Sequence, residues 1–256
     1  MFSRVVYGLC AMTVGASVAP AKEEAEHVYN AGSRPELFTD DWLICQLSGG
    51  ARLRLHQPQP QEAALVCDAP WEGNACGYIT VIRDTDRYRM YYRGAHMRVT
   101  PTEYTEAHPM VYCYAESTDG VHWVRPVLRL VEFGGSTENN IILDERFGHS
   151  FAPFKDENPE CPPEAKYKAL ANGTAGHGLY ALKSPDGIHW TLMSDKPVIT
   201  DGALDSQNLA FWDVERKEYR AYYRDFRQGR DIKTATSRDF INWTPGTWLV
   251  YCPGRI

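Results

Sequence analysis

Ser117-Thr118-Asp119-Gly120-Val121-His122-Trp123 is the stretch that decides the fold, because the chain repeats it. It returns as Ser184-Pro185-Asp186-Gly187-Ile188-His189-Trp190, and in altered form as Ser237-Arg238-Asp239-Phe240-Ile241-Asn242-Trp243. The copies begin 67 and then 53 residues apart, and self-similarity near such a period is typical of a repeated supersecondary unit. We therefore expect one structural unit built three times.

Aromatic stretches precede each copy and predict that the unit is made of strands. Tyr88-Arg89-Met90-Tyr91-Tyr92 and Tyr219-Arg220-Ala221-Tyr222-Tyr223 have the residue types that favour a strand, and Asp119-Gly120 is a strong hairpin signal. Four strands are expected in the first unit, at 78–82, 88–93, 110–116 and 121–123. The sequence predicts an all-β fold, a β-propeller of four-stranded antiparallel blades, with blades near 68–125, 145–192 and 203–245.

Aspartates recur at equivalent places in the units, which favours a role in turns. Asp84, Asp156 and Asp213 follow the first strands, and Asp119, Asp186 and Asp239 lie in the repeated phrase. An aspartate side chain can bond the backbone of its own turn. We expect these acids to shape turns and the tryptophan that ends each phrase to pack between blades.

The N-terminus reads as a secretory signal peptide at 1–21, with a basic start, an apolar run and small residues before the cleavage site. A linker at 22–35 and the propeller domain at 36–256 would follow. This predicts a secreted or periplasmic protein with no membrane attachment after cleavage. The net charge of −6, without a basic stripe, disfavours nucleic-acid binding.

The cysteines leave the question of disulfides open. Cys10 would leave with the signal peptide, and the six that remain allow fifteen pairings. Cys113 lies in an apolar strand and is expected to be buried. No CxxC or HExxH motif occurs, so no zinc site and no cofactor are predicted, and no ligand pattern supports a structural calcium ion.

The order of strands predicts which loops share a face. The segments before the first strands (68–74, 146–150 and 201–208) and the loops between the second and third strands (94–109, 172–178 and 225–231) lie at one end of a four-stranded meander. Functional loops gather on one face of a rigid scaffold. These segments carry acids, imidazoles, amides and indoles that do not repeat between units, as expected of a binding site.

The blade pattern resembles the five-bladed propellers of the arabinanase, levansucrase and invertase superfamily. Within it, residues 55–60, 67–73 and 205–212 resemble a planctomycete-type group of secreted, glycosyl-hydrolase-like proteins, and the likeness covers most of 35–255. The resemblance implies a glycoside hydrolase that acts on a poly- or oligosaccharide through carboxylates at the leading ends of the inner strands. The corresponding positions here, Tyr78, Ser150 and Gln207, are not acidic. With three units visible, the chain is expected to be C-terminally truncated.

Paired carboxylates and sugar-binding side chains complete the expected site. Glu72 and Asp205 are the predicted reacting pair, with Asp68 as a substitute for Glu72. The predicted substrate-binding residues are Trp71, Asn74, Arg93, His96, His149, Gln207, Asn208 and Arg224. The alternatives are a carbohydrate-binding or scaffolding propeller without turnover, and an inactive fragment. The repeated phrase is also similar to the sialidase Asp-box, which is architectural and implies no sialidase activity.

Overall fold

The computed structural model describes residues 37, 43–174 and 176–250. By its internal contacts the chain divides into two compact units, Met1–Pro60 and Gln61–Ile256. The described residues of the first unit contain no helix or strand. The predicted signal peptide (1–21) and linker (22–35) lie outside the described residues, as does Cys252. All of the described regular structure belongs to the second unit.

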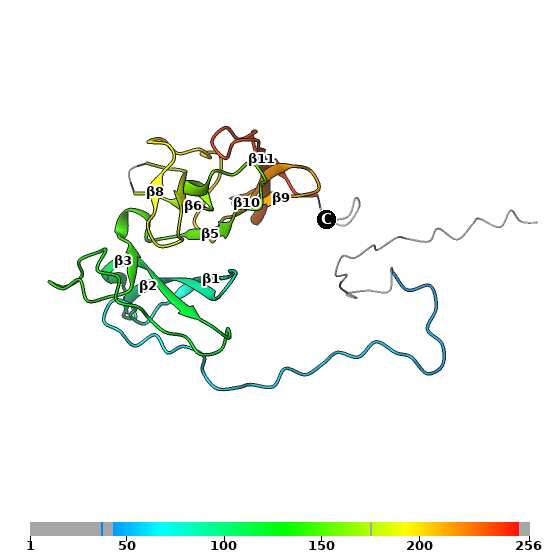
Figure 1. The fold of residues 1–256 in the computed structure, drawn as a ribbon, viewed down its shortest axis with the longest axis horizontal. Helices are drawn as coiled ribbons and strands as arrows, with labels where there is room; N and C mark the ends of the chain where they lie inside the picture. The colour runs from blue at the N-terminus through cyan, green and yellow to red at the C-terminus, as the bar shows by residue number, and fades with distance from the viewer. Residues whose placement is uncertain (1–36, 38–42, 175, 251–256) are drawn as a thin grey trace, which may run out of the picture. The chain divides into compact units, whose positions relative to one another are not determined.

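The second unit contains three four-stranded sheets, in which strands adjacent in the sequence pair antiparallel (Figure 1). Their orders are β1-β2-β3-β4, β5-β6-β7-β8 and β12-β11-β10-β9. The elements are β1 Gly77–Arg83, β2 Tyr88–Val99, β3 Tyr104–Ser117, β4 Ile141–Leu143, η1 Glu145–Phe147, β5 Phe151–Lys155, η2 Pro163–Ala165, β6 Tyr167–Asn172, β7 Leu179–Ser184, β8 Thr191–Leu192, β9 Leu209–Asp213, β10 Glu218–Phe226, β11 Arg230–Ser237 and β12 Thr247–Trp248. The all-β expectation is therefore confirmed, with sheets of the kind that form propeller blades.

The first strands of the three sheets are neighbours. β1 packs beside β5, and β5 packs beside β9. We call these three strands the inner strands. Each inner strand packs beside the inner strand of the next sheet. Side chains at their leading ends therefore come close to one another, and so do side chains at their trailing ends.

The aspartates that end the inner strands form turns, as predicted. Asp84, Asp156 and Asp213 each accept a hydrogen bond from a backbone N–H one or two residues further along, at 2.9–3.1 Å. Such bonds fix the reversal into the second strand of each sheet.

Asp84 also ties the first sheet to the second. Tyr167 of the second sheet donates its hydroxyl to the Asp84 carboxylate, and Lys155 Nζ lies 2.8 Å from Asp84 Oδ1. Arg89 of the first sheet donates from Nε to Asp84 Oδ2 at 3.0 Å. Only 3% of the Asp84 side chain is exposed, so its charge is balanced inside the interface. The pKa of Asp84 is held well below its usual range: burial opposes the shift, but the bonds from Lys155, Tyr167 and Arg89 outweigh it.

Asp156 repeats this arrangement between the second and third sheets. Tyr219 of the third sheet donates its hydroxyl to Asp156 Oδ2 at 2.7 Å, and Lys168 of the second sheet pairs with the same carboxylate. Asp213 of the third sheet is bound by Arg216 and Arg220 but by no tyrosine hydroxyl from the part of the chain that the structure describes. The ties therefore connect the sheets in chain order.

The repeated phrase is a turn closed by its own side chains. In the first copy, Ser117 Oγ accepts from Gly120 N at 2.9 Å, and Asp119 Oδ1 accepts from Val121 N and His122 N at 2.8 Å. The same bonds recur in the second and third copies. The predicted turn role of these acids is confirmed.

The second copy of the turn also joins two sheets. Trp190 contacts Tyr91 of the first sheet and Phe151 of the second, with ring centroids 6.3 and 4.8 Å away. The Tyr91 hydroxyl donates to Gly187 O at 3.0 Å. Gly187 has a φ of +77°, and a Cβ there would lie 2.6 Å from the Tyr91 hydroxyl oxygen, so only glycine fits. The expectation that this tryptophan packs between sheets is confirmed.

Two local predictions were wrong. No strand forms at 121–123, and a single bridge joins the next residue, Val124, to Glu116. The fourth strand of the first sheet is β4, which lies beyond the predicted blade boundary at residue 125. In the third sheet β12 likewise lies beyond the predicted boundary at residue 245. Hydrogen bonds that the Val121 and His122 N–H groups donate to Asp119 hold the residues after the turn and compete with sheet pairing. Residues 94–109 are mostly strand, because β2 and β3 continue as a hairpin. In the β2 half, buried Ala95 and Met97 alternate with exposed His96 and Arg98, a signal of a strand that the sequence analysis overlooked; the β3 half at 104–109 is almost wholly exposed.

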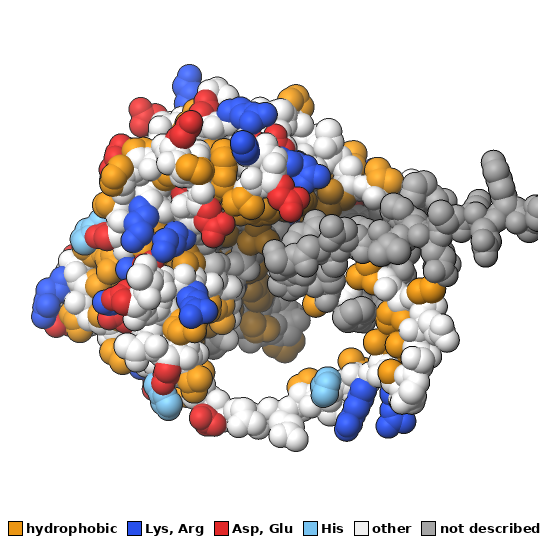
Figure 2. Space-filling model, turned by 45° about the vertical axis from the view of Figure 1, so that its right-hand side comes forward, with side chains coloured by type: hydrophobic (Ala, Val, Ile, Leu, Met, Phe, Trp, Pro, Cys, Tyr) orange, Lys and Arg blue, Asp and Glu red, His pale blue; other side chains and the backbone are white. Residues whose placement is uncertain are grey.

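The surface of the second unit carries mixed charge. On the face in Figure 2, Lys and Arg side chains are interspersed with Asp and Glu. Among the described residues, no helix has the length and apolar character needed to cross a membrane.

The turn acids should make stability depend on pH. Burial opposes the shift, but the bonds from the His189 backbone and side chain lower the pKa of Asp186 to about 2. Its pKa is near 3.9 in an unfolded chain, so the unfolded state takes up the proton first and stability is lost as pH falls. Between roughly pH 5 and pH 2 the protein should lose about 1 kcal/mol of unfolding free energy through Asp186, a figure that allows for solvent screening. We expect Asp186→Asn to remove this part of the loss. Urea unfolding across this range checks it; an unchanged slope in the variant would contradict it.

Candidate functional site

The leading ends of the inner strands bring side chains from all three sheets together around Tyr78. The Tyr78 hydroxyl donates to Asp205 O at 3.4 Å, and the His149 ring lies 5.9 Å from the Tyr78 ring. The guanidinium carbon of Arg93 lies 4.5 Å from the centre of the Tyr78 ring. We call the following residues the inner-strand cluster: Tyr78, Arg93, His149, Asp205, Gln207 and Arg224.

Tyr78 has an unusual backbone conformation. Its φ is +50°, which is uncommon for a residue other than glycine. The pairing of β1 with β2 shifts register between Gly77 and Thr80, on either side of it. Gln207 Nε2 donates to Thr80 Oγ1 at 3.0 Å and so links the third sheet to the first at this point. Strained residues that their surroundings hold in place are frequent at functional sites.

Asp205 presents a carboxylate to solvent from a fixed loop. Its side chain is 53% exposed and pairs with the Arg224 guanidinium, which is only 11% exposed. Asn208 fixes the loop: its side-chain amide donates to Leu204 O at 3.0 Å and to Ser206 O at 2.9 Å. Asn208 is itself 1% exposed, so it supports the site from behind and does not face a ligand.

His149 lies between charges of both signs. Burial lowers its pKa first and Arg93 lowers it further, while Asp205 and Glu106 act in the opposite direction. The net pKa lies below the ordinary value, so the imidazole is neutral at pH 7. A neutral ring can both donate and accept a hydrogen bond. The negative charges of Asp205 and Glu106 thus partly offset the effects of burial and of Arg93 on this histidine.

Several buried nitrogens of the cluster have no hydrogen-bond partner among the described residues. They are Arg93 Nε, His149 Nδ1 and Arg224 Nε. Buried polar atoms in native proteins usually bind protein, water or another molecule. Because three such nitrogens lie in one cluster, the cluster can offer hydrogen bonds to a polar ligand.

Glu72 lies apart from this cluster, on the other side of the first sheet. Its side chain is fully buried and accepts from Ala69 N at 2.9 Å, from the Tyr92 hydroxyl at 2.6 Å and from Arg125 Nη1 at 2.7 Å. Tyr92 belongs to the apolar cluster on that outer side. No contact within the described part of the chain joins Glu72 to Asp205.

Other predicted site residues hold the same segment in place. Trp71 Nε1 donates to Asn140 Oδ1 at 2.7 Å, and the Asn74 side chain exchanges hydrogen bonds with the Met97 backbone at 2.8 and 2.9 Å. Asp68 is bound by Arg125 at 3.0 Å. These bonds give the segment before β1 a structural role. His96 lies on the β2–β3 hairpin opposite His108.

The structure therefore brings some predicted residues together and separates others. The predicted residues in the inner-strand cluster are Arg93, His149, Asp205, Gln207 and Arg224. Those grouped on the outer side of the first sheet are Asp68, Trp71, Glu72 and Asn74.

Sequence reasoning did not assign a site role to Tyr78, Arg125 or Glu106. The sequence does carry a signal for Tyr78. It stands at the position that Ser150 and Gln207 occupy in the other two units, and it is the one aromatic residue of the three. Arg125 had no signal, since 53 residues separate it from Glu72. Glu106 had none either, because the segment that carries it was expected to be a loop.

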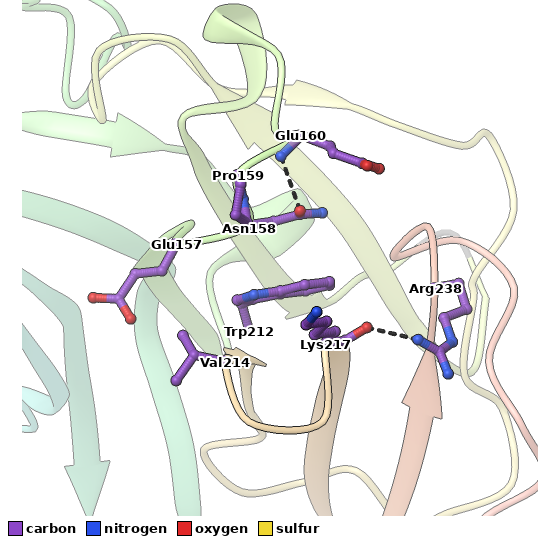
Figure 3. A pocket seen from close by; sticks show the side chains of 8 residues that line it. All are labelled: Glu157, Asn158, Pro159, Glu160, Trp212, Val214, Lys217 and Arg238. Carbon is purple, nitrogen blue, oxygen red and sulfur yellow. Dashed lines mark hydrogen bonds between the residues drawn. The ribbon is translucent and has the colours of Figure 1, made fainter.

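A separate hollow of about 490 Å³ lies at the trailing ends of β5 and β9. Figure 3 shows Trp212 at its centre, with Glu157 on one side and Lys217 on the other. Arg238 Nη1 donates to Lys217 O at 2.7 Å and closes one edge. None of the predicted site residues lines this hollow. In the described residues, no group of three or more His, Cys, Asp or Glu side chains is placed to hold a metal ion.

No protein-family profile and no curated protein matches the chain. Among solved structures it is similar to a glycosyl hydrolase from Bacteroides ovatus, with 18% identity and a TM-score of 0.42 over 67% of this chain and 51% of that chain. It is also similar to a fructofuranosidase from Schwanniomyces occidentalis complexed with fructose, with 16% identity and a TM-score of 0.42 over 62% of this chain and 30% of that chain. A third match is an N-acetylgalactosamine deacetylase from F. plautii in complex with blood group B trisaccharide. Its identity is 16% and its TM-score 0.40, over 66% of this chain and 51% of that chain. The chain spans about half of these proteins or less, and the likeness assigns neither an activity nor catalytic residues.

Proposed function

We propose that the chain binds an oligosaccharide at the inner-strand cluster and hydrolyses a glycosidic bond there, as part of a secreted five-bladed propeller. The observation that carries the proposal is the meeting of Tyr78, His149 and Asp205, one from the leading end of each inner strand. Sugar hydroxyls require convergent donors and acceptors. The cluster offers guanidinium, imidazole, amide and carboxylate groups around one aromatic ring.

The reacting pair in this proposal is Asp205 and Glu106. Glycoside hydrolysis generally uses one carboxylic acid to protonate the leaving oxygen and a second carboxylate to attack or to activate water. Glu72 has no exposed surface and is bound by Arg125, so it cannot reach a substrate in this arrangement. Asp205 and Glu106 are both exposed to solvent, and the negative charge of each raises the pKa of His149. Asp205, paired with Arg224, would be the base or nucleophile, and Glu106 the acid.

Binding without turnover is the second candidate. The ion pair between Asp205 and Arg224 favours it, because a carboxylate held by a guanidinium is a weaker nucleophile and can instead orient a bound sugar. The two candidates differ in whether product is released.

Asp205→Asn should lower product release by about 100-fold, since proton transfer or attack by the carboxylate is lost. Reducing-end release from a panel of oligosaccharides, normalised to folded protein, measures this. Asp195→Asn, an exposed acid in the segment after β8, is the matched control and should keep full activity. Full activity in Asp205→Asn would remove Asp205 from the mechanism. Retention of sugar with no product from the unmodified protein would favour binding alone.

A further inference from the structure

The segment before β1 covers the outer side of the first sheet. Leu65, Cys67, Trp71 and Cys76 pack there against the apolar cluster of the first sheet, which consists of Met90, Tyr92, Val111, Cys113, Ala115 and Ile141. This segment also carries the buried Glu72. A bond that restrains this segment would therefore also stabilise its packing on the outer side of the sheet.

Cys67 and Cys76 lie beside each other within this segment. The Cys76 thiol donates to Glu72 O at 3.3 Å, and a side-chain hydrogen bond also joins Cys67 and Cys76. Both cysteines are partly exposed, whereas Cys113 in β3 is 0% exposed. A small reagent from solvent can therefore reach Cys67 and Cys76, but not Cys113.

The surrounding chain holds the two thiols together without a covalent bond. The two Asn74–Met97 hydrogen bonds fasten the segment to β2 between the cysteines. Trp71 O approaches so closely that a Cβ on Gly94 would lie 2.4 Å from it. The packing of the sheet thus holds both cysteines on the same apolar cluster, within one fastened segment.

We propose that Cys67 and Cys76 are a disulfide-forming pair that reacts with low-molecular-weight disulfides. The thiolate of one cysteine attacks a sulfur of the reagent, forms a mixed disulfide and releases one reagent thiol. The thiolate of the second cysteine then attacks the protein sulfur of that mixed disulfide and releases the second reagent thiol. Two protein thiols are oxidised, one reagent disulfide is reduced, and the two protons go to the released thiols. The pair is independent of the proposed sugar binding.

The surroundings of the pair set the rate of this reaction. Burial raises the pKa of both thiols, that of Cys76 to about 12. Thiolate is the attacking species, so exchange should be slow at neutral pH and faster as the pH rises. Once formed, the bond closes the loop 67–76 around Trp71 and Glu72.

The test is peptide mapping of the folded, full-length chain after incubation with oxidised glutathione. Residues 55–83 contain both cysteines and no Lys or Arg before Arg83, so trypsin releases them in one peptide. After alkylation of free thiols, we expect this peptide to carry no alkyl group and to be lighter than its reduced form by two hydrogen atoms. Two alkyl groups on this peptide, or a link to the peptide that carries Cys113, would overturn the proposal.

Thermal unfolding gives a second readout. The closed loop restricts the unfolded chain, so the oxidised protein should melt roughly 4–10 °C above the reduced one. Cys67→Ser should melt at the same temperature with and without oxidised glutathione, while Cys161→Ser, the matched control in the connection between β5 and β6, should keep the difference. An equal redox shift in Cys67→Ser would contradict the assignment.

Discussion

Asp156→Asn is expected to lower the free energy of unfolding by about 3–5 kcal/mol, because it leaves the Lys168 ammonium buried without its counter-charge. The side chains of Asp156 and Lys168 are 0% and 4% exposed. Burial alone would lower the pKa of Lys168, but the hydrogen bonds that it donates to Asp156 and Cys161 raise the pKa above its usual value. Removal of the carboxylate reverses this balance, and it also takes away the acceptor of the Tyr219 hydroxyl.

Urea unfolding at pH 7 measures the loss. Asp213→Asn is the matched control, since Asp213 has the same place in the third sheet but no tyrosine from a following sheet among the described residues. We expect its effect to be much smaller. The double variant Asp156→Asn with Lys168→Met should recover much of the stability, because no buried charge then remains unpaired. Equal losses at Asp156 and Asp213 would contradict the proposed coupling between sheets.

Glu72→Gln should cost about 2–4 kcal/mol of stability, somewhat less than a fully buried pair because Arg125 keeps contact with solvent. The Glu72 side chain is 0% exposed, whereas that of Arg125 is 31% exposed. The neutral amide cannot balance the guanidinium, and it must also satisfy the Tyr92 hydroxyl and the Ala69 N–H.

Asp68→Asn is the control for this second variant. Asp68 binds the same Arg125, but its side chain is 66% exposed, so the loss should stay below about 1 kcal/mol. Both stability and product release should be measured per folded molecule. Loss of activity in Glu72→Gln without loss of stability would return Glu72 to the catalytic role that its sequence position first suggested.

The repeated phrase was enough to predict the class of fold because its bonds are local. Ser117, Asp119 and their counterparts close each turn within a few residues, so the pattern is visible in the sequence. The position of β4 was not visible, because it pairs with β3 after a long excursion. A three-residue strand has too few side chains to show a period.

The candidate site was predicted only in part, for a related reason. The pairing of Asp205 with Arg224 could be anticipated, because Asp205 precedes β9 and Arg224 lies near the end of the neighbouring strand β10. The burial of Glu72 could not be predicted, because Glu72 is paired with Arg125 and nothing in the sequence connects the two. The side of a sheet that a leading segment covers is decided by packing between distant parts of the chain.

The aspartate–tyrosine ties have a consequence for how the molecule unfolds. Each tie joins one sheet to the next, from Asp84 to Tyr167 and from Asp156 to Tyr219. The described sheets therefore form a short one-dimensional lattice with nearest-neighbour coupling. In such a lattice an end unit can fray at the cost of one interface, whereas opening the centre breaks two. Amide exchange should accordingly be slowest in β6, the strand that carries Tyr167 at one tie and Lys168 at the other.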